Sequence, residues 1–404
     1  MTVSYGMIKQ ALAGQRLPAA FVDLDAFDAN AARVRDLLRG RGTPLRIASK
    51  SLRVPELLRR LLDRSEGDFV GLMCFCTEEA AFLAGLGFDD LLVAYPPVQD
   101  SDLSLAARLT ADGTAIRLMA DSREGVDRIA AAGRAANVTI DVVLCVDMSL
   151  ELGAGRVHLG VRRSPLHGVE DVVRLARHVA DREGTRFFGI MGYEAQVAGL
   201  GDANPFEPLL NPFKALIRSA SARELGPRRQ RMVDELTRQG LAPTLVNGGG
   251  SGSLDSTTPQ TGVTEVTAGS AFFKPHLFDY FRSAHMQALE PACFFALEAT
   301  RRPRPDMVTC LGGGYVASGP PSRDKVPLPW LPPGAELVAE EMCGEVQTPV
   351  VLRDPSEVAL GDPIVFRHAK GGELAERFGE MLLLRGSEVV GSAKTYRGEG
   401  QCFF

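Results

Sequence analysis

Residues 244–270 read TLVNGGGSGSLDSTTPQTGVTEVTAGS. Two short apolar runs in this segment each end in small residues, first at 247–253 and then at 268–270. Apolar runs of this length, bounded by glycines, are typical of β-strands that are buried on both faces. We therefore predict strands over residues 244–250 and 264–270, each followed by a glycine-containing loop.

Six further apolar runs precede this segment, and a helical pattern follows most of them. After residues 46–50, for example, the apolar positions 54, 57, 58, 61 and 62 recur at the period of a helix. Eight strand–helix units over about 250 residues predict an α/β fold, a (β/α)8 TIM barrel with parallel strands. The predicted strands are residues 46–50, 69–75, 90–95, 115–121, 140–147, 187–194, 244–250 and 264–270.

The two ends of the chain depart from this alternation. Residues 19–25 and 31–38 resemble a strand and a helix, which we place before the barrel; counting them within it would shift the strand order by one. Beyond about residue 281, prolines cluster and short strand-like runs appear, as is typical of an all-β domain. A doubly wound open sheet is the competing architecture, but it would not predict this tail. We predict a barrel domain over residues 15–285 and a C-terminal β-domain over residues 286–404, which residues 1–14 can also join.

Composition excludes several classes of protein. Lys and Arg total 45 against 50 Asp and Glu, a net charge of −5, so the chain lacks the basic surface that nucleic-acid binding needs. No run approaches the about 18–20 apolar residues of a membrane helix, and residues 1–10 do not resemble a signal peptide. We expect a cytoplasmic protein with no nucleic acid or membrane partner. The seven cysteines lack zinc-finger spacing, which favours reduced thiols.

The two glycine loops are the first candidates for a binding site, because phosphate commonly binds after strands seven and eight of such barrels. Their backbone N–H groups can converge on an anion. The candidate residues are Gly248, Gly249, Gly250, Ser251, Gly269 and Ser270. Two tight turns without a ligand are the alternative. The run lacks a P-loop ending, and Ser253 stands where a dinucleotide motif has its third glycine, so a free nucleotide is disfavoured.

Lys50 ends the first predicted strand, which neighbours strands seven and eight in a closed barrel. Apolar surroundings at the mouth would disfavour the charged form of its amine by desolvation, as a lysine that attacks an aldehyde needs. A surface lysine at a strand end is the alternative. A phosphate site beside such a lysine suits a phosphorylated aldehyde, and pyridoxal 5'-phosphate is the obvious candidate.

The order of several motifs resembles the fold-type III pyridoxal-phosphate enzymes, in the branch of D-threonine aldolase and D-serine dehydratase, whose barrel is alanine-racemase-like. The motifs are residues 17–25, 46–50, 76–80, 91–96, 247–253 and 265–270. The resemblance implies that Lys50 is the Schiff-base lysine and that the protein is a homodimer whose β-domain completes the partner's active site. It also implies a lyase for D-amino acids, with β-hydroxy D-amino acids favoured, acting by retro-aldol cleavage or by dehydration and deamination.

The resemblance also implies roles on strands five and six. It places a hydrogen-bonding or positively charged side chain toward the cofactor's phenolic oxygen. When residues 160–161 are matched to the family, this side chain is His158, and Arg156 lies two positions earlier. It places Tyr193 beside the cofactor ring as a catalytic candidate. A packed or salt-bridged Tyr193–Glu194 pair is the alternative for this strand end.

Two departures from the family pattern concern chemistry near the lysine. The family carries histidines two places before and after it, where this chain has Ala48 and Leu52. Metal-binding members use His-x-Cys or His-x-Asp in the β-domain, where this chain has His368 and Lys370, and a protonated lysine is no metal ligand. We predict no metal site, with His368 a ligand only if a metal is present. A hypothesis is that the Lys370 ammonium takes the metal's catalytic place; an exposed strand end is the alternative for both residues.

Two other functions stay open. An amino-acid racemase or epimerase of the same fold needs two bases on opposite faces, and Tyr315 is the candidate partner of Lys50. A non-catalytic pyridoxal-phosphate carrier needs only the lysine, although it would not need a β-domain. In an enzyme, Tyr315 and residues 344–349 are candidates to face a substrate held by the other subunit.

Overall fold

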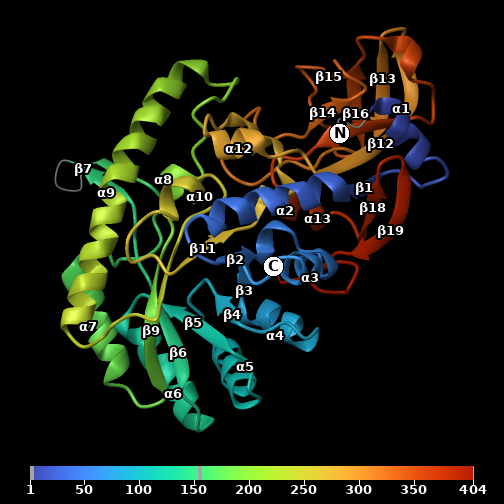
Figure 1. Cartoon of the computed structure of the whole chain (residues 1–404). Helices are drawn as coiled ribbons and strands as arrows, with labels where there is room; N and C mark the ends of the chain where they lie inside the picture. Colours follow the sequence, from blue (N-terminus) through green and yellow to red (C-terminus); the bar gives the residue numbers. More distant parts are fainter. Residues whose placement is uncertain (1–3, 153–156, 404) are drawn as a thin grey trace.

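The computed structural model describes residues 4–152 and 157–403, and its barrel contains the eight predicted strands in the predicted order. All eight run parallel, and pairing of Val266 with Leu45 closes the ring (Figure 1). The predicted (β/α)8 barrel is therefore confirmed. Its strands are β2 Leu45–Ala48, β3 Phe69–Cys74, β4 Leu91–Val93, β5 Ile116–Ala120, β6 Ile140–Cys145, β9 Thr185–Gly192, β10 Leu245–Gly248 and β11 Glu265–Ala268.

Helices cover the outside of the barrel, and each main helix buries an apolar face. Helix α3 begins at Pro55, whose fixed φ suits the first turn, and buries Leu57 and Leu61 while Arg59 stays exposed. The barrel helices are α2 Leu24–Arg39, α3 Pro55–Asp63, α4 Thr77–Gly85, α5 Asp100–Ala111, α6 Arg123–Ala135, α7 Val169–Ala180, α9 Asn211–Arg238 and α11 Ser270–Phe273. Within the two described ranges, no helix has both the length and the apolar character needed to cross a bilayer.

Short elements complete the loops that connect the main strands and helices. Strands β7 and β8 pair antiparallel as a hairpin between β6 and α7. The short elements are β7 Leu150–Leu152, β8 Val157–Leu159, η1 Ser49–Ser51, α8 Ala195–Ala198, η2 Pro208–Leu210, α10 Leu254–Thr257, η3 His276–Tyr280 and α12 Ala284–Ala288.

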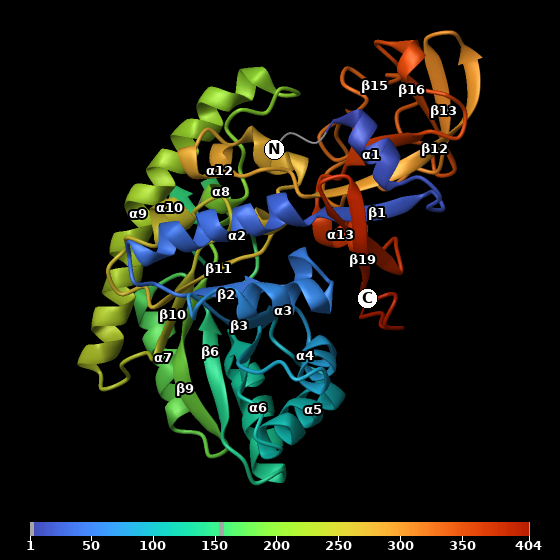
Figure 2. The same ribbon diagram turned by 45° about the vertical axis from the view of Figure 1, so that its right-hand side comes forward.

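The second domain is a nine-stranded sheet beside the barrel (Figures 1 and 2). Eight of its strands lie in the C-terminal part of the chain, as the sequence predicts. They are β12 Cys293–Arg304, β13 Met307–Leu311, β14 Leu328–Leu331, β15 Glu336–Leu337, β16 Gln347–Val351, β17 Pro363–Arg367, β18 Glu380–Arg385 and β19 Glu388–Lys394, with η4 Pro355–Glu357 and α13 Gly371–Ala375 between them.

The ninth strand of this sheet is β1, Ala19–Asp23, which we expected to lead into the barrel. It pairs antiparallel with β12 and parallel with β18, in the interior of the second sheet. Ala20, Phe21 and Val22 are all buried, as a strand covered on both faces requires. Helix α1, Tyr5–Ala11, packs on the same domain, and the Tyr5 hydroxyl donates to the carbonyl of Pro363 at 3.0 Å. The barrel is therefore inserted between two parts of the β-domain.

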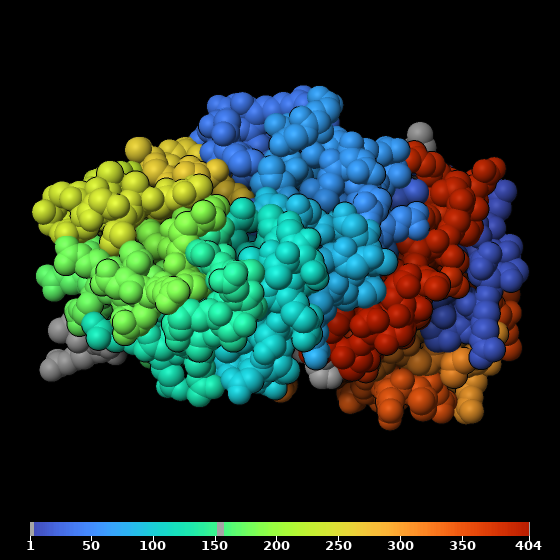
Figure 3. Space-filling model, turned by 90° about the horizontal axis from the view of Figure 1, so that it is seen from below, coloured from blue at the N-terminus to red at the C-terminus, as the bar shows by residue number. Residues whose placement is uncertain are grey.

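The C-terminal residues return to the barrel and lie against its early helices, as the view from below shows (Figure 3). Phe403 packs with Phe75 and Phe82, near the start of α4 and within it. Tyr396 joins the same aromatic cluster through Phe82 and Phe403. These contacts fasten the end of the chain to the barrel.

Side chains fill the inside of the barrel. An apolar cluster consists of Leu92, Met119, Val143, Met191 and Leu245. A bidentate ion pair joins Arg46 and Glu265, with both N–O distances at 2.8 Å and with side chains that are only 3% and 6% exposed. Because side chains alternate along a strand, the positions of Arg46, Ala48 and Lys50 follow one another toward the mouth.

Candidate active site

Lys50 lies at the mouth of the barrel, in the single turn η1 that follows β2; we call η1 the lysine turn. Its Nζ is 3.3 Å from the hydroxyl oxygen of Tyr95, which follows β4, and 5.9 Å from the centre of that ring. The hydroxyl of Ser49 holds the turn by donating to the carbonyl of Met73 at 2.8 Å. Lys50 is exposed, whereas the sequence predicted an amine enclosed by apolar residues. Tyr95 is a neighbour that the sequence did not single out.

A buried carboxyl group lies behind the lysine turn. Glu79, in α4, is fully buried and accepts hydrogen bonds from the N–H of Phe75 at 2.6 Å and from the hydroxyl of Tyr396 at 2.8 Å. Burial raises the pKa of Glu79 to about 7, although its hydrogen bonds, including one with Ser49, partly oppose that shift. Glu79 thus links the loop after β3, the lysine turn and the C-terminal segment.

We expect the stability of the protein to depend on pH through Glu79. A carboxyl group with a pKa of about 7 when folded and 4.5 when unfolded binds more protons in the folded state between these values. The free energy of unfolding therefore falls as the pH rises through this window, by about 3 kcal/mol at about 1.36 kcal/mol per pKa unit. Buried histidines with a lowered pKa, such as His276, add the opposite slope in part of this window, so the difference between the wild type and Glu79→Gln in urea unfolding should show the slope of Glu79. The exposed neighbour Glu78 provides the control Glu78→Gln, and an unchanged slope in Glu79→Gln would contradict the assignment.

The loops after β10 and β11 meet at the same end of the barrel as the lysine turn, because β10, β11 and β2 are neighbours in the ring. The hydroxyl of Ser251 accepts a hydrogen bond from the N–H of Ala271 at 2.9 Å, and the hydroxyls of Ser270 and Ser51 are 3.3 Å apart. Among the residues that the structure describes, the N–H groups of Gly250, Ser251 and Ser270 donate no hydrogen bond. Three free donors on two adjacent loops can receive an anion of phosphate size.

The other predicted glycines shape this cradle. The N–H of Gly249 donates to the carboxylate of Glu194 at 2.8 Å, and Gly248 lies within β10. Gly249 has a φ of +85°, a backbone conformation that favours glycine. A Cβ on Gly269 would lie 2.6 Å from the carbonyl oxygen of Ala48, so glycine is needed where this loop meets β2.

Tyr193 and Glu194, at the end of β9, have different surroundings. Tyr193 packs against the apolar cluster inside the barrel, and burial raises the pKa of its hydroxyl to about 12, which makes it a donor at neutral pH. Glu194 is buried in the barrel wall, 3.0 Å from Nη2 of Arg229 and 2.8 Å from the hydroxyl of Thr257. Glu194 is therefore a salt-bridged part of the scaffold, and Tyr193 is the site candidate of the two.

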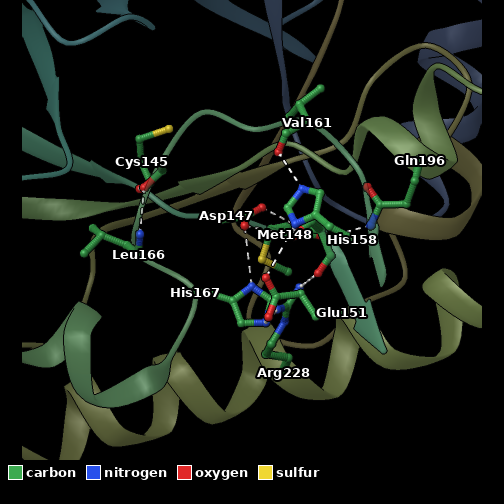
Figure 4. Close-up of polar contacts among 12 residues, drawn as sticks. Cys145, Asp147, Met148, Glu151, His158, Val161, Leu166, His167, Gln196 and Arg228 are labelled. Carbon is green, nitrogen blue, oxygen red and sulfur yellow. Dashed lines mark hydrogen bonds and ion pairs between the residues drawn. The ribbon is translucent and has the colours of Figure 1, made fainter. Parts of the chain in front are cut away.

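His158 belongs to a polar cluster at the β7–β8 hairpin (Figure 4). Its Nδ1 is 3.4 Å from the hydroxyl of Ser149 and 3.5 Å from the carboxylate of Glu151, and its Nε2 is 3.3 Å from the carbonyl of Val161. Both ring nitrogens thus have partners in the hairpin and its adjoining loops. Arg156, the other candidate for the cofactor's phenolic oxygen, lies outside the described residues.

The same cluster is a candidate metal centre that the sequence analysis missed. One ligand atom from each of Asp147, Glu151 and His158 lies within 4.8 Å of the others, a set that zinc or manganese accepts. Arg228 lies beside the two carboxylates and donates to the carbonyl of Ser149 at 2.8 Å, and burial lowers its pKa. This positive charge competes with a metal for the same carboxylates. No motif marks the set, because the three ligands come from both sides of a hairpin.

His368 and Lys370 lie between β17 and α13, and neither side chain is free. In the His368 ring, Nε2 is 2.6 Å from the carbonyl oxygen of Tyr315, and Nδ1 is 2.6 Å from the carbonyl oxygen and 2.9 Å from the N–H of Lys370. The ammonium of Lys370 is 2.7 Å from the hydroxyl of Ser318 and 3.0 Å from the carboxylate of Glu373. Backbone groups therefore occupy both ring nitrogens of His368, and the charge of Lys370 is already paired.

The β-domain also touches the lysine turn directly. A Cβ on Gly372 would lie 1.9 Å from the carbonyl oxygen of Lys50, so glycine is required where α13 crosses the turn. The ring of Tyr315 packs edge-on against Phe295 and Phe378, within the β-domain. Residues 345–347 are exposed.

Comparison with known proteins adds to this geometry. The family described as alanine racemase, N-terminal domain, matches residues 22–276. A 3-hydroxy-D-aspartate aldolase of Paracoccus denitrificans (strain Pd 1222) is 25% identical over 256 residues, 63% of this chain but only 60% of that protein. A D-threonine aldolase of Arthrobacter sp is 25% identical over 310 residues, 76% of this chain and 74% of that protein. The crystal structure of D-threonine aldolase from Filomicrobium marinum shares the fold, with a TM-score of 0.80 and 22% identity over 96% of this chain and 97% of that one.

Proposed function

Because this chain belongs to the family of the alanine racemase N-terminal domain, we propose that it is a pyridoxal-phosphate-dependent lyase that acts on β-hydroxy D-amino acids. The proposal depends on one observation: a lysine amine and the free N–H groups of two neighbouring loops share one rim of the barrel. A phosphorylated aldehyde needs both, since the amine bonds to the aldehyde and the N–H groups receive the phosphate. The names of the aldolase relatives support the substrate class.

The residues at this rim fit the cofactor. Gly250, Ser251 and Ser270 would hold its phosphate, and Lys50 would bond to its aldehyde. Glycine is needed at position 250, because a Cβ there would lie 2.7 Å from the Cβ of Ala198. When bound, the cofactor supplies an electron sink for the bond that breaks at the substrate Cα.

The side chains at the mouth bind the substrate and move protons. The Lys50 amine would serve as the base beside the reacting carbon, and the Tyr95 hydroxyl, 3.3 Å from it, would orient the amine. Tyr193 keeps its proton at neutral pH and can donate a hydrogen bond but not accept a proton. In retro-aldol cleavage the Cα–Cβ bond breaks, a base takes the β-hydroxyl proton, and Cα gains a proton. The products are then an aldehyde and a shorter amino acid.

An assay with cofactor-loaded protein tests the proposal against its alternatives. Mixing with a panel of β-hydroxy D-amino acids should change the visible spectrum and release an aldehyde, or a keto acid with ammonia, both with and without a chelator. A racemase would instead convert D-alanine to L-alanine, which chiral chromatography detects. A carrier would leave the spectrum unchanged with every amino acid, and either of these results would contradict the lyase proposal.

We further propose that the protein is a homodimer, because apolar side chains are exposed on both domains. Leu209, Phe213 and Leu216, in η2 and at the start of α9, are 89%, 68% and 66% exposed. Val346 in the β-domain is 61% exposed. Clustered exposed apolar residues are typical of protein interfaces. Light scattering should give the mass of two chains, and the mass of one chain would contradict this proposal.

A cytoplasmic location is also part of the proposal. None of the seven cysteines, all of which lie within the described residues, forms a disulfide in the structure. Free thiols are typical of proteins in a reducing compartment. A divalent metal is not part of the proposed mechanism, and the chelator arm of the assay tests that.

A further inference from the structure

Arg163 is a cation at the mouth of the barrel with no carboxylate partner within the described ranges. Its guanidinium lies 5.6 Å from the ring centre of Tyr193, and the side chain is exposed. It also interacts electrostatically with Cys145 at the end of β6, which places it on the β6–β9 side of the mouth. Across residues 4–152 and 157–403, the structure shows no hydrogen bond or ion pair to this guanidinium. Arg163 is therefore free to bind an anion.

The loop that carries Arg163 is held on both sides of it. On one side, the carbonyl of Val161 lies 3.3 Å from Nε2 of His158 (Figure 4). On the other, the hydroxyl of Ser164 donates to the carbonyl of Cys145 at 2.6 Å and accepts from the N–H of Leu166 at 3.1 Å. These contacts fix the backbone near the end of β6. The guanidinium is thus held near Tyr193 before any ligand binds.

Arg163 and Lys50 lie on opposite sides of the mouth. In the closed ring, β6 is four strands away from β2, which leads to the lysine turn. The phosphate loops follow β10 and β11, between these two sides, and Arg163 lies outside them. Arg163 therefore lies where it could meet the far end of a substrate whose amino group reacts beside Lys50.

We propose that Arg163 binds the distal carboxylate of a dicarboxylic β-hydroxy D-amino acid and so selects such substrates over monocarboxylic ones, an inference that rests on the proposed lyase function. A guanidinium offers two parallel N–H donors that match both oxygens of a carboxylate. Arg163 already contacts the Tyr193 ring and lies on a fixed loop. Its side chain therefore loses less conformational entropy when a carboxylate binds. Because Arg163 forms no ion pair with any residue that the structure describes, no such ion pair has to break first.

Binding of two acids that lack an amine tests this role without turnover. D-malate carries a second carboxylate and D-lactate does not, and titration calorimetry on cofactor-loaded protein measures both affinities. Arg163→Met should weaken D-malate binding by about 10- to 100-fold, the range for a lost hydrogen bond to a charged group. D-lactate binding should not change. Arg162→Met removes the same charge one residue away, at an exposed position, and should change neither affinity.

Three results would overturn the inference. Unchanged D-malate binding in Arg163→Met would show that the arginine binds no carboxylate. Equal losses of affinity for D-malate and D-lactate would show that Arg163 binds the carboxylate that both acids share. Weaker retention of pyridoxal phosphate on dialysis would assign it to an oxygen of the cofactor. If D-malate binding depends on Arg163 but the wild type cleaves no β-hydroxy D-amino acid, only the proposed lyase function fails.

Discussion

Replacing Lys50 with alanine should remove the visible colour of the cofactor-loaded protein and lower lyase activity by about a thousandfold or more. The amine is the group at the rim that can bond to an aldehyde and then accept a proton, and alanine can do neither. Absorbance spectra after incubation with pyridoxal phosphate measure the first effect, and aldehyde release from a β-hydroxy D-amino acid measures the second.

The matched control for this variant is Lys370→Ala. Lys370 has the same amine, but its Nζ is bonded to the hydroxyl of Ser318 and paired with Glu373. We expect this variant to keep its colour, because the paired ammonium is not available to an aldehyde. Borohydride reduction followed by peptide mass spectrometry should then find the cofactor on residue 50. A coloured and active Lys50→Ala protein would refute the assignment of the site.

Arg46→Met should lower the free energy of unfolding by about 3–5 kcal/mol, the usual cost of removing one partner of a buried ion pair. Arg46 bonds Glu265 through two hydrogen bonds inside the barrel, and methionine would leave that carboxylate buried without its cation. Asn247, whose side-chain amide donates to Glu265 at 2.7 Å, replaces only part of the interaction. Urea unfolding of the two proteins measures the difference.

An ion pair at the surface provides the control for Arg46→Met. Arg33 and Glu290 form such a pair, with both side chains 38% exposed, so Arg33→Met should cost less than about 1 kcal/mol. Arg46→Met combined with Glu265→Leu removes both charges of this pair and should recover part of the lost stability, since Asp90, 3.0 Å from Nη2 of Arg46, keeps only its ion pair with Arg117. Equal losses for the Arg46 and Arg33 variants would show that burial does not govern the ion pair in the barrel.

The barrel and its rim could be predicted because their signals are local. Each strand is a short apolar run followed by a helical period, and the last two strands end in glycines where adjacent loops must approach each other closely. Closure of the ring then brings strands seven and eight beside strand one, so the positions of Lys50, Gly250 and Ser270 follow from counting. The loops after the other barrel strands carry no glycine run or strand-end lysine that would mark their site residues in the same way.

What the sequence did not predict depends on contacts between distant segments. Nothing in the residues around 163 shows that their loop is anchored to the end of β6, so Arg163 could not be recognised as a residue of the mouth. The His-x-Lys segment suggested free side chains, but a carbonyl more than fifty residues earlier binds the ring of His368. In the same way, the buried partner of Glu79 is Tyr396, near the opposite end of the chain.

The position of β1 in the second sheet has a consequence for synthesis of the protein on the ribosome. This strand leaves the exit tunnel long before its neighbours β12 and β18, which follow the whole barrel in the chain, and Val22 pairs with Leu383 of β18. At about 5–20 residues per second, the nascent chain waits on the order of tens of seconds for that partner. During this time the apolar residues of β1 have no sheet to join, so a holding chaperone should act on this segment until translation ends.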